Sequence, residues 1–174
     1  ILKSYEVEYS VATPQGRDAL RESLKLLPDI ARSYRLALQC GYKHIHQALP
    51  RMLMLFFRYG RELHPDFSPF SEGRHEAFVR SIEAKLCEEM KAASEKIPAY
   101  VWLTALPQLI SRVCHDNVLV KQHLGELIGV VFRAYPQQCM WMSMGVLRSK
   151  YRAAAKKELE SIIYRAIGRD ARLE

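Results

Sequence analysis

Glycine and cysteine are both scarce in this sequence, and neither is clustered. The eight glycines among 174 residues form no phosphate-binding loop of the G-x-x-x-x-G-K or G-x-G-x-x-G kind. The four cysteines, Cys40, Cys87, Cys114 and Cys139, contain no C-x-x-C pair, which argues against a zinc knuckle or a small disulfide framework. We therefore expect reduced, mostly buried thiols in an intracellular protein.

Long apolar runs and strand patterns are also missing. The longest apolar runs, MLMLFF at 52–57 and LIGVVF at 127–132, fall far short of the roughly 20 residues that a membrane-spanning helix needs. No membrane segment is expected, and the first residues lack the pattern of a signal peptide. The one alternating stretch, YEVEYSV near residue 5, is too short and too isolated to found a sheet.

Helical spacing dominates the rest of the chain. Thr13 followed by Pro14 is typical of a helix start, and this first helix is expected to end at Pro28. Asp29 can cap a second helix, which Gly41 should end. The two segments together predict a helical hairpin.

A third helix is expected from about Lys43 to Leu63, with a kink or a restart at Pro50. HPDFSPFSEG at 64–73 has two prolines and a glycine and predicts a loop. A polar helix from about Arg74 to Lys96 follows. Because its apolar stripe is narrow, we expect this helix to lie on the outside.

From Pro98 onward the sequence is more apolar. Three dense segments occupy 98–115, 118–134 and 136–148, and a last amphipathic helix is expected at about 150–167. Short joints between successive helices indicate antiparallel neighbours.

These elements predict an all-α fold, an α-solenoid of stacked antiparallel helical hairpins of the TPR or HEAT type. Residues 1–174 are interpreted as part of a single helical-repeat domain. Its first helices occupy about 1–63, the loop 64–73, and the remaining helices 74–174.

The stretch YPQQCMWMSMGVL at 135–147 is apolar around most of its helical circumference. Such a helix is expected to be covered by neighbours on both flanks, and this is favoured over a cofactor or ligand groove. The predicted structural core comprises Leu53, Leu106, Leu109, Met140, Trp141 and Met144. If Trp141 is buried, its replacement by Ala should cost about 3–5 kcal/mol.

No group of residues has the geometry of a catalytic or metal site. In Cys114-His115-Asp116, residues adjacent in sequence point in different directions, so they cannot form a nucleophile, base and orienting group with one another. The two imidazoles of His44-x-His46 are on opposite sides of a helix, whereas a metal pair needs the spacing i, i+4. We therefore assign no catalytic, cofactor-binding or metal-ligating residue.

The net charge of +7 is unevenly distributed. Residues 17–61 carry nine Lys or Arg against three acidic residues, whereas 62–95 carry eight acidic residues against four basic ones. Glu88-Glu89 is interpreted as a solvated pair. The candidate interaction surface comprises Arg112, His115, Lys150, Arg152, Lys156 and Lys157. Direct nucleic-acid contact by the basic block from Arg17 to Arg61, or by the cluster of Lys150, Arg152, Lys156 and Lys157, is not favoured over a solvated face.

Two stretches resemble one protein family. WLTALPQLISRVCH at 102–115 and YPQQCMWMSMGVLRSKY at 135–151 are similar to the FAT domain of the phosphatidylinositol-kinase-related protein kinases. Two combinations resemble the ATR (ataxia-telangiectasia and Rad-related) type more than the ATM, TOR or DNA-dependent types. They are ISR at 110–112 with CH at 114–115, and YPQQ at 135–138 with MWM at 140–142. YKHIHQALPRMLMLFFRYG at 42–60 is similar to the segment upstream.

The resemblance implies a segment of a large nuclear serine/threonine kinase of DNA damage and replication stress signalling. Since the chain begins with Ile1 and ends on RDARLE, we expect a piece of such a protein. By resemblance, its partners would be its own kinase domain and a subunit like the ATR-interacting protein, with dimerisation. The parent kinase would use ATP and magnesium, and none of their ligands maps onto this segment.

We therefore interpret the chain as a non-catalytic scaffold that supports and regulates the adjacent kinase domain. An independent helical-repeat adaptor is the alternative, because it predicts the same stacked helices. A basic helical nucleic-acid binder is a weaker alternative, and its affinity for single strands would depend strongly on salt.

Overall fold

The computed structural model describes residues 22–62 and 74–168, and every regular element within these ranges is a helix. Residues 22–25 are helical. They are followed by α3 (Leu27–Cys40), α4 (Ile45–Glu62), α5 (Arg74–Lys96), α6 (Ala99–Thr104), α7 (Leu106–Ile110), α8 (Val118–Ala134), α9 (Pro136–Leu147) and α10 (Ala153–Gly168). The all-α prediction is confirmed. Within the same ranges, no helix combines the length and hydropathy that a bilayer crossing requires.

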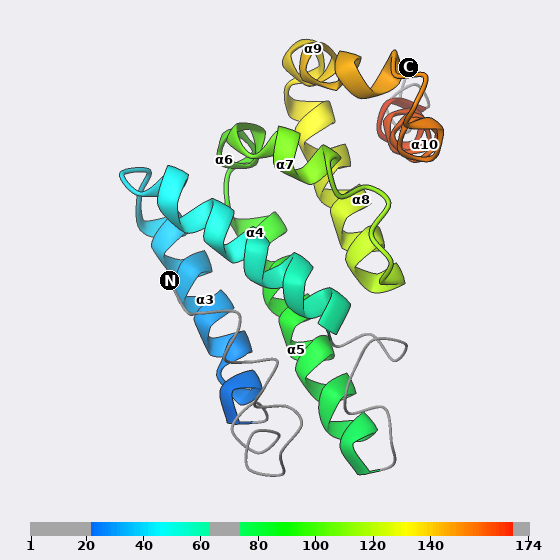
Figure 1. Cartoon of the computed structure of the whole chain (residues 1–174). Coiled ribbons are helices and arrows are strands. Elements are labelled where there is room, and N and C mark those ends of the chain that lie inside the picture. Colours follow the sequence, from blue (N-terminus) through cyan, green and yellow to red (C-terminus); the bar gives the residue numbers. More distant parts are fainter. Residues whose placement is uncertain (1–21, 63–73, 169–174) are drawn as a thin grey trace.

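The helices form two packed groups that are joined through α8. In Figure 1, α3, α4 and α5 lie at one end of the molecule, and α9 and α10 lie at the other. The helix α8 contacts α5 and α6 on one side and α9 and α10 on the other. Successive helices thus stack along the molecule, as expected for a helical-repeat solenoid.

Proline marks several helix starts, although not always where the sequence predicted. Residues 22–25 are helical and Leu26 is a turn, so a helix ends just before Pro28, close to where the sequence predicted. Pro28 itself lies in the first turn of α3, whose N-cap is Leu26, so the prediction that Asp29 caps this helix is wrong. The reason is that a proline in the first turn needs no N–H partner and has a suitable φ angle. Pro50 lies inside α4, which is continuous, so no helix restarts there. The helix predicted from Thr13 lies largely outside the described residues.

The second half of the chain follows the predicted segments closely. The charged helix α5 has the predicted bounds, and α10 begins at Ala153, slightly after the predicted start. The apolar segment after Pro98 divides into α6 and α7. Pro107 lies in the first turn of α7 and has no N–H to donate to the preceding turn, which interrupts the helical hydrogen bonds. Just before it, the Ala105 N–H donates to the Trp102 carbonyl three residues earlier at 3.0 Å. The loop predicted at 64–73 lies outside the described residues.

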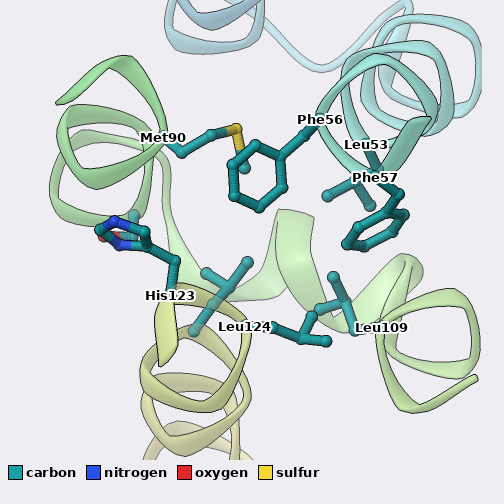
Figure 2. Close-up of a pocket in the computed structure, with 9 residues that line it drawn as sticks. Leu53, Phe56, Phe57, Met90, Leu109, His123 and Leu124 are labelled. Carbon is teal, nitrogen blue, oxygen red and sulfur yellow. The ribbon is translucent and has the colours of Figure 1, made fainter. Parts of the chain in front are cut away.

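One hydrophobic core runs through all the described helices. Leu53, Leu106 and Leu109 are completely buried, as is Trp102. Figure 2 shows side chains of α4, α5, α7 and α8 converging on a small cavity of about 10 Å³. Because so small a space holds at most about one water molecule, the core here is densely packed.

The predicted burial of Trp141 is wrong. Its side chain is 82% exposed, Met140 is 39% exposed, and Met144 is half-buried. The inner face of α9 consists of Cys139, Ser143 and Val146, which recur at the spacing of a helical turn. Trp141 lies two residues from Cys139, about 200° around the helix axis, and so it faces away from the core.

A salt bridge joins the basic segment 17–61 to the acidic segment 62–95. Arg35 of α3, only 7% exposed, donates from Nε to Glu89 Oε2 of α5 at 2.8 Å. The interpretation of Glu88-Glu89 as a solvated pair is therefore wrong for Glu89. Removing one partner would leave the other charge partly buried without compensation, which is costly. This ion pair fixes α3 beside α5.

The four thiols divide into two kinds. Cys40 and Cys114 are exposed, so the prediction of mostly buried thiols holds only for Cys139 and partly for Cys87. Burial raises the pKa of the Cys139 thiol to about 11. Burial also raises the pKa of Cys87 to about 11, with a smaller contribution from the Glu83 carboxylate. These two thiols therefore stay protonated, and unreactive as nucleophiles, at neutral pH.

The two tryptophans allow a direct test of the fold. Trp102→Ala should lower the free energy of unfolding by about 3–5 kcal/mol, because it leaves a large cavity in the core. Trp141→Ala should change it by only about 0.5 kcal/mol, because the indole is mostly solvated. Urea denaturation followed by circular dichroism measures both. Equal losses for the two variants would contradict the placement of Trp141.

Candidate interaction sites

A groove of about 490 Å³, with both polar and apolar side chains in its lining, lies between α4 and the turns that follow α7. It is lined by Met54, Phe57, Arg58, Gln108, Ser111, Arg112, Cys114, His115 and Asp116. The groove thus brings together Arg112 and His115, two of the predicted interaction residues. It also contains the whole Cys114-His115-Asp116 triplet.

The His115 ring has a positioning role in this groove. Its Nε2 lies 3.0 Å from the Phe57 carbonyl oxygen of α4, and its Nδ1 accepts a hydrogen bond from the Asn117 N–H at 3.1 Å. Since Nδ1 is the acceptor, the hydrogen-bond network assigns the proton to Nε2. Both ring nitrogens are therefore occupied, and His115 has no free nitrogen to act as a base toward Cys114.

Asn117 is the residue that joins the helices around this groove. It is 2% exposed and is the N-cap of α8, where its Oδ1 accepts from Leu119 N–H at 2.9 Å and from Val120 N–H at 3.2 Å. Its Nδ2 donates to the Gly60 carbonyl at 2.8 Å and to Glu83 Oε1 at 2.6 Å. The whole hydrogen-bonding capacity of the amide is thus used.

These bonds connect three helices that are distant in sequence. Gly60 lies in the last turn of α4, where carbonyl groups lack partners within the helix, and Glu83 belongs to α5. We call the set Phe57, Gly60, Glu83, His115 and Asn117 the Asn117 junction. It fixes the start of α8 against the end of α4 and the middle of α5.

Gly60 is required by the close approach of the two helices at the Asn117 junction. A Cβ atom built on Gly60 would lie 2.4 Å from Val120 Cγ2 and 3.7 Å from His115 Cε1. The first distance is far below van der Waals contact, so a side chain at this position would require Val120 or the backbone of α4 or α8 to shift.

The sequence patterns do not predict the Asn117 junction. The only local signal was Asn117 directly before the apolar run VLVKQHL, the usual pattern of a helix N-cap. Gly60 and Glu83 had no detectable signal, because their role depends on which helices meet in space.

The remaining predicted interaction residues lie at the other end of the molecule. Lys150 and Arg152 are exposed in the connection between α9 and α10. Lys156 lies 3.8 Å from Glu160 within α10, and Lys157 is exposed. The predicted interaction residues therefore lie in two separate places. Arg112 and His115 line the groove, and the four remaining cations lie in the connection between α9 and α10 and in α10 itself, which we call the α9–α10 part.

Exposed apolar side chains accompany the α9–α10 part. On α9, Met140, Trp141 and Met142 are exposed, and Tyr151 follows in the connection.

Among the residues that the structure describes, no three His, Cys, Asp or Glu side chains are grouped so that they could hold a metal ion.

The family model and the related proteins that match this chain all belong to the ATR-like kinases. The family model "Serine/threonine-protein kinase ATR-like, HEAT repeats" matches residues 85–171. The serine/threonine-protein kinase ATR of Oryza sativa subsp. indica is 35% identical over 147 residues, which are 84% of this chain and 5% of that protein. No solved structure matches the chain.

Two further relatives come from other lineages. The serine/threonine-protein kinase ATR of Arabidopsis thaliana is 35% identical over 129 residues, 74% of this chain and 5% of that protein. The protein kinase rad3 of Schizosaccharomyces pombe is 32% identical over 129 residues, 72% of this chain and 5% of that protein. The chain thus spans about 5% of the length of these curated relatives.

These matches confirm the ATR-type resemblance and the helical-repeat fold that the sequence predicted. The matching family model describes HEAT repeats. The assignment to a FAT domain stays a prediction.

Variants of Asn117 test the junction. Asn117→Ala should lower the free energy of unfolding by about 2–4 kcal/mol, because the cap is lost and buried polar groups lose their partners. Asn117→Ser keeps a capping oxygen and should lose about 1–3 kcal/mol. Asn117→Asp also keeps the cap, but its carboxylate would face Glu83, so it should be less stable than the Ser variant at neutral pH.

Urea denaturation of the three Asn117 variants and the wild type measures this order. A Ser variant as stable as the wild type would contradict the junction, because Asn117 would then act only as a helix cap.

Proposed function

The chain belongs to the family of ATR-like serine/threonine-protein kinases with HEAT repeats, and from this premise we propose that it is a non-catalytic scaffold segment of such a kinase. In this role the stacked helices support the kinase domain of the parent protein and regulate it by transmitting the binding of partners. The FAT region next to the kinase domain is the proposed location.

The continuity of the core carries this proposal. Buried side chains of α3 through α10 form one cluster, with no break between the two ends of the molecule. A force or displacement at one end is therefore transmitted to the other by close-packed side chains. The Asn117 junction and the Arg35–Glu89 ion pair add fixed polar contacts between helices that are far apart in sequence.

The chemistry of the groove also supports a non-catalytic role. The nitrogens of His115 are occupied by the Phe57 carbonyl and the Asn117 N–H, so the triplet lacks a base for the exposed Cys114 thiol. Phosphorylation of Ser or Thr followed by Gln, with ATP and magnesium, would belong to the kinase domain of the parent protein.

The wider setting of the segment is part of the same proposal. By family membership, the parent protein would act in the nucleus, in the response to DNA damage and replication stress. Its partners would include a subunit like the ATR-interacting protein, and a second copy in a dimer. An adaptor role is the second candidate, and the exposed apolar residues of α9 favour it.

A core variant in the full-length parent kinase tests the scaffold role. Leu109→Ala should remove about 2–5 kcal/mol of stability from the helical stack and lower kinase activity several-fold, although no ATP-binding group is changed. Leu109→Met is the matched control, because it conserves volume and should cost less than about 1.5 kcal/mol. Activity on a peptide substrate and the melting temperature are measured for both.

The two candidate functions predict different results in this experiment. Undiminished kinase activity in soluble Leu109→Ala protein would contradict the scaffold role. If partner binding were lost while kinase activity stayed unchanged, the adaptor role would be supported instead.

A further inference from the structure

The helix α9 has two apolar faces, and the helices that the structure describes cover only one of them. Its inner face, Cys139, Ser143 and Val146, is buried against the rest of the stack. Its outer face is centred on Trp141, which is 82% exposed. A helix that is apolar on both sides is normally buried on both sides, since water contact with a large indole is unfavourable.

The shape of the outer face is suited to receiving side chains. Gly145 lies one turn after Trp141 on the same side of the helix, and a Cβ built there would meet nothing within 4 Å. The helix therefore has no side chain at this position on the face of the indole, and we call this gap the notch at Gly145. Met140 and Met142, which are 39% and 44% exposed, flank the indole with flexible side chains that adapt to a partner's surface.

The charged residues of α9 and of the connection that follows it have one sign. From Leu127 to Lys157 the sequence contains no Asp or Glu. Arg148 follows Trp141 by two helical turns on the same side, and Lys150 and Arg152 are exposed in the connection after it. Within the described part of the chain, none of these three cations forms an ion pair.

The cations are concentrated at one end of the apolar face. They lie at and beyond the C-terminal end of α9, whereas Gln137 and Gln138 lie at its beginning. A partner that matches this surface therefore has an apolar stripe with negative charge at one end. An amphipathic helix with a cluster of Asp or Glu after its apolar residues has this chemistry.

We propose that the outer face of α9 is a docking site for an acidic amphipathic helix. The apolar residues of that helix pack around Trp141 and into the notch at Gly145, and its carboxylates lie against Arg148, Lys150 and Arg152. This inference does not depend on the scaffold role, because it concerns only the surface of α9.

Charge disfavours two other occupants. A second copy packed with its α9 parallel would bring the same unpaired cations of the two copies close together. A second copy packed antiparallel would place them beside Gln137 and Gln138, which carry no negative charge to match them. A single-stranded nucleic acid needs cations along the path of its backbone, and here they occupy only one end of the face.

The 174-residue chain provides its own fluorescent reporter, because Trp102 is completely buried and Trp141 is exposed. The probe is a tryptophan-free amphipathic peptide with Leu at positions i, i+3, i+4 and i+7 and Glu at one end. Its controls are the same peptide with Lys in place of Glu, and an acidic peptide with the Leu positions scrambled. Binding should shift the tryptophan emission to shorter wavelength and reduce acrylamide quenching.

The expected result is a preference for the acidic amphipathic peptide over both control peptides by about tenfold in Kd, decreasing as salt rises. With a dye-labelled peptide, Trp141→Ala should weaken binding by about tenfold or more, as expected for a buried aromatic anchor. Arg148→Glu combined with Arg152→Glu should weaken it to a similar extent. Tyr164→Ala, which changes an exposed aromatic residue of α10, is the matched control and should bind as the wild type does.

Three outcomes would overturn the proposal. Equal binding of the acidic and basic peptides would remove the charge argument. Stronger protection of Trp141 by a single-stranded oligonucleotide would identify a nucleic-acid surface instead. Protection that grows with protein concentration alone, together with a dimer in analytical ultracentrifugation, would identify a second copy as the occupant.

Discussion

The Asn117 side chain forms the contact on which the arrangement of the helices depends. One buried amide accepts two N–H groups of α8 and donates to α4 and α5, so three helices are fixed at one point. Because a buried amide with unused donors or acceptors is costly, the site has one favourable geometry. Gly60 then allows α8 to approach α4 closely enough for these bonds to form.

This contact lies where the two ends of the stack meet. The helices α3, α4 and α5 are on one side of it, and α8 carries α9 and α10 on the other (Figure 1). The apolar core holds these groups together. Because apolar packing is not directional, however, the core does not by itself fix their relative orientation. The polar bonds at Asn117 add direction, which a scaffold needs if it is to present surfaces in a fixed relation. The exposed face of α9 is one such surface.

The sequence was sufficient to predict the helices and the family but not their contacts. Hydrophobic periodicity predicted α5 and the apolar segments after Pro98, because a periodic apolar face is a local property. Leu53, Leu106 and Leu109 were predicted in the core and are buried there. Trp141 was predicted in the core and is exposed, since periodicity shows that a helix has two apolar faces but not which of them has a neighbour.

The Arg35–Glu89 pair and the junction partners Gly60 and Glu83 could not be predicted for a related reason. Arg35 and Glu89 are 54 residues apart in the chain, and Gly60 and Asn117 are 57 residues apart. One sequence by itself does not show which of its distant segments are in contact. Charge counts identified a basic segment and an acidic segment, yet the contact of one residue from each required the fold.

Amide hydrogen exchange on the wild-type chain and on Asn117→Ser tests the central role of this contact most directly. The Ser variant keeps the cap of α8 but loses the donors to Gly60 and Glu83. The account predicts that protection falls together at the end of α4 near Phe57, in α5 near Glu83 and in the first turns of α8. A loss confined to the first turn of α8, with α4 and α5 unchanged, would contradict it.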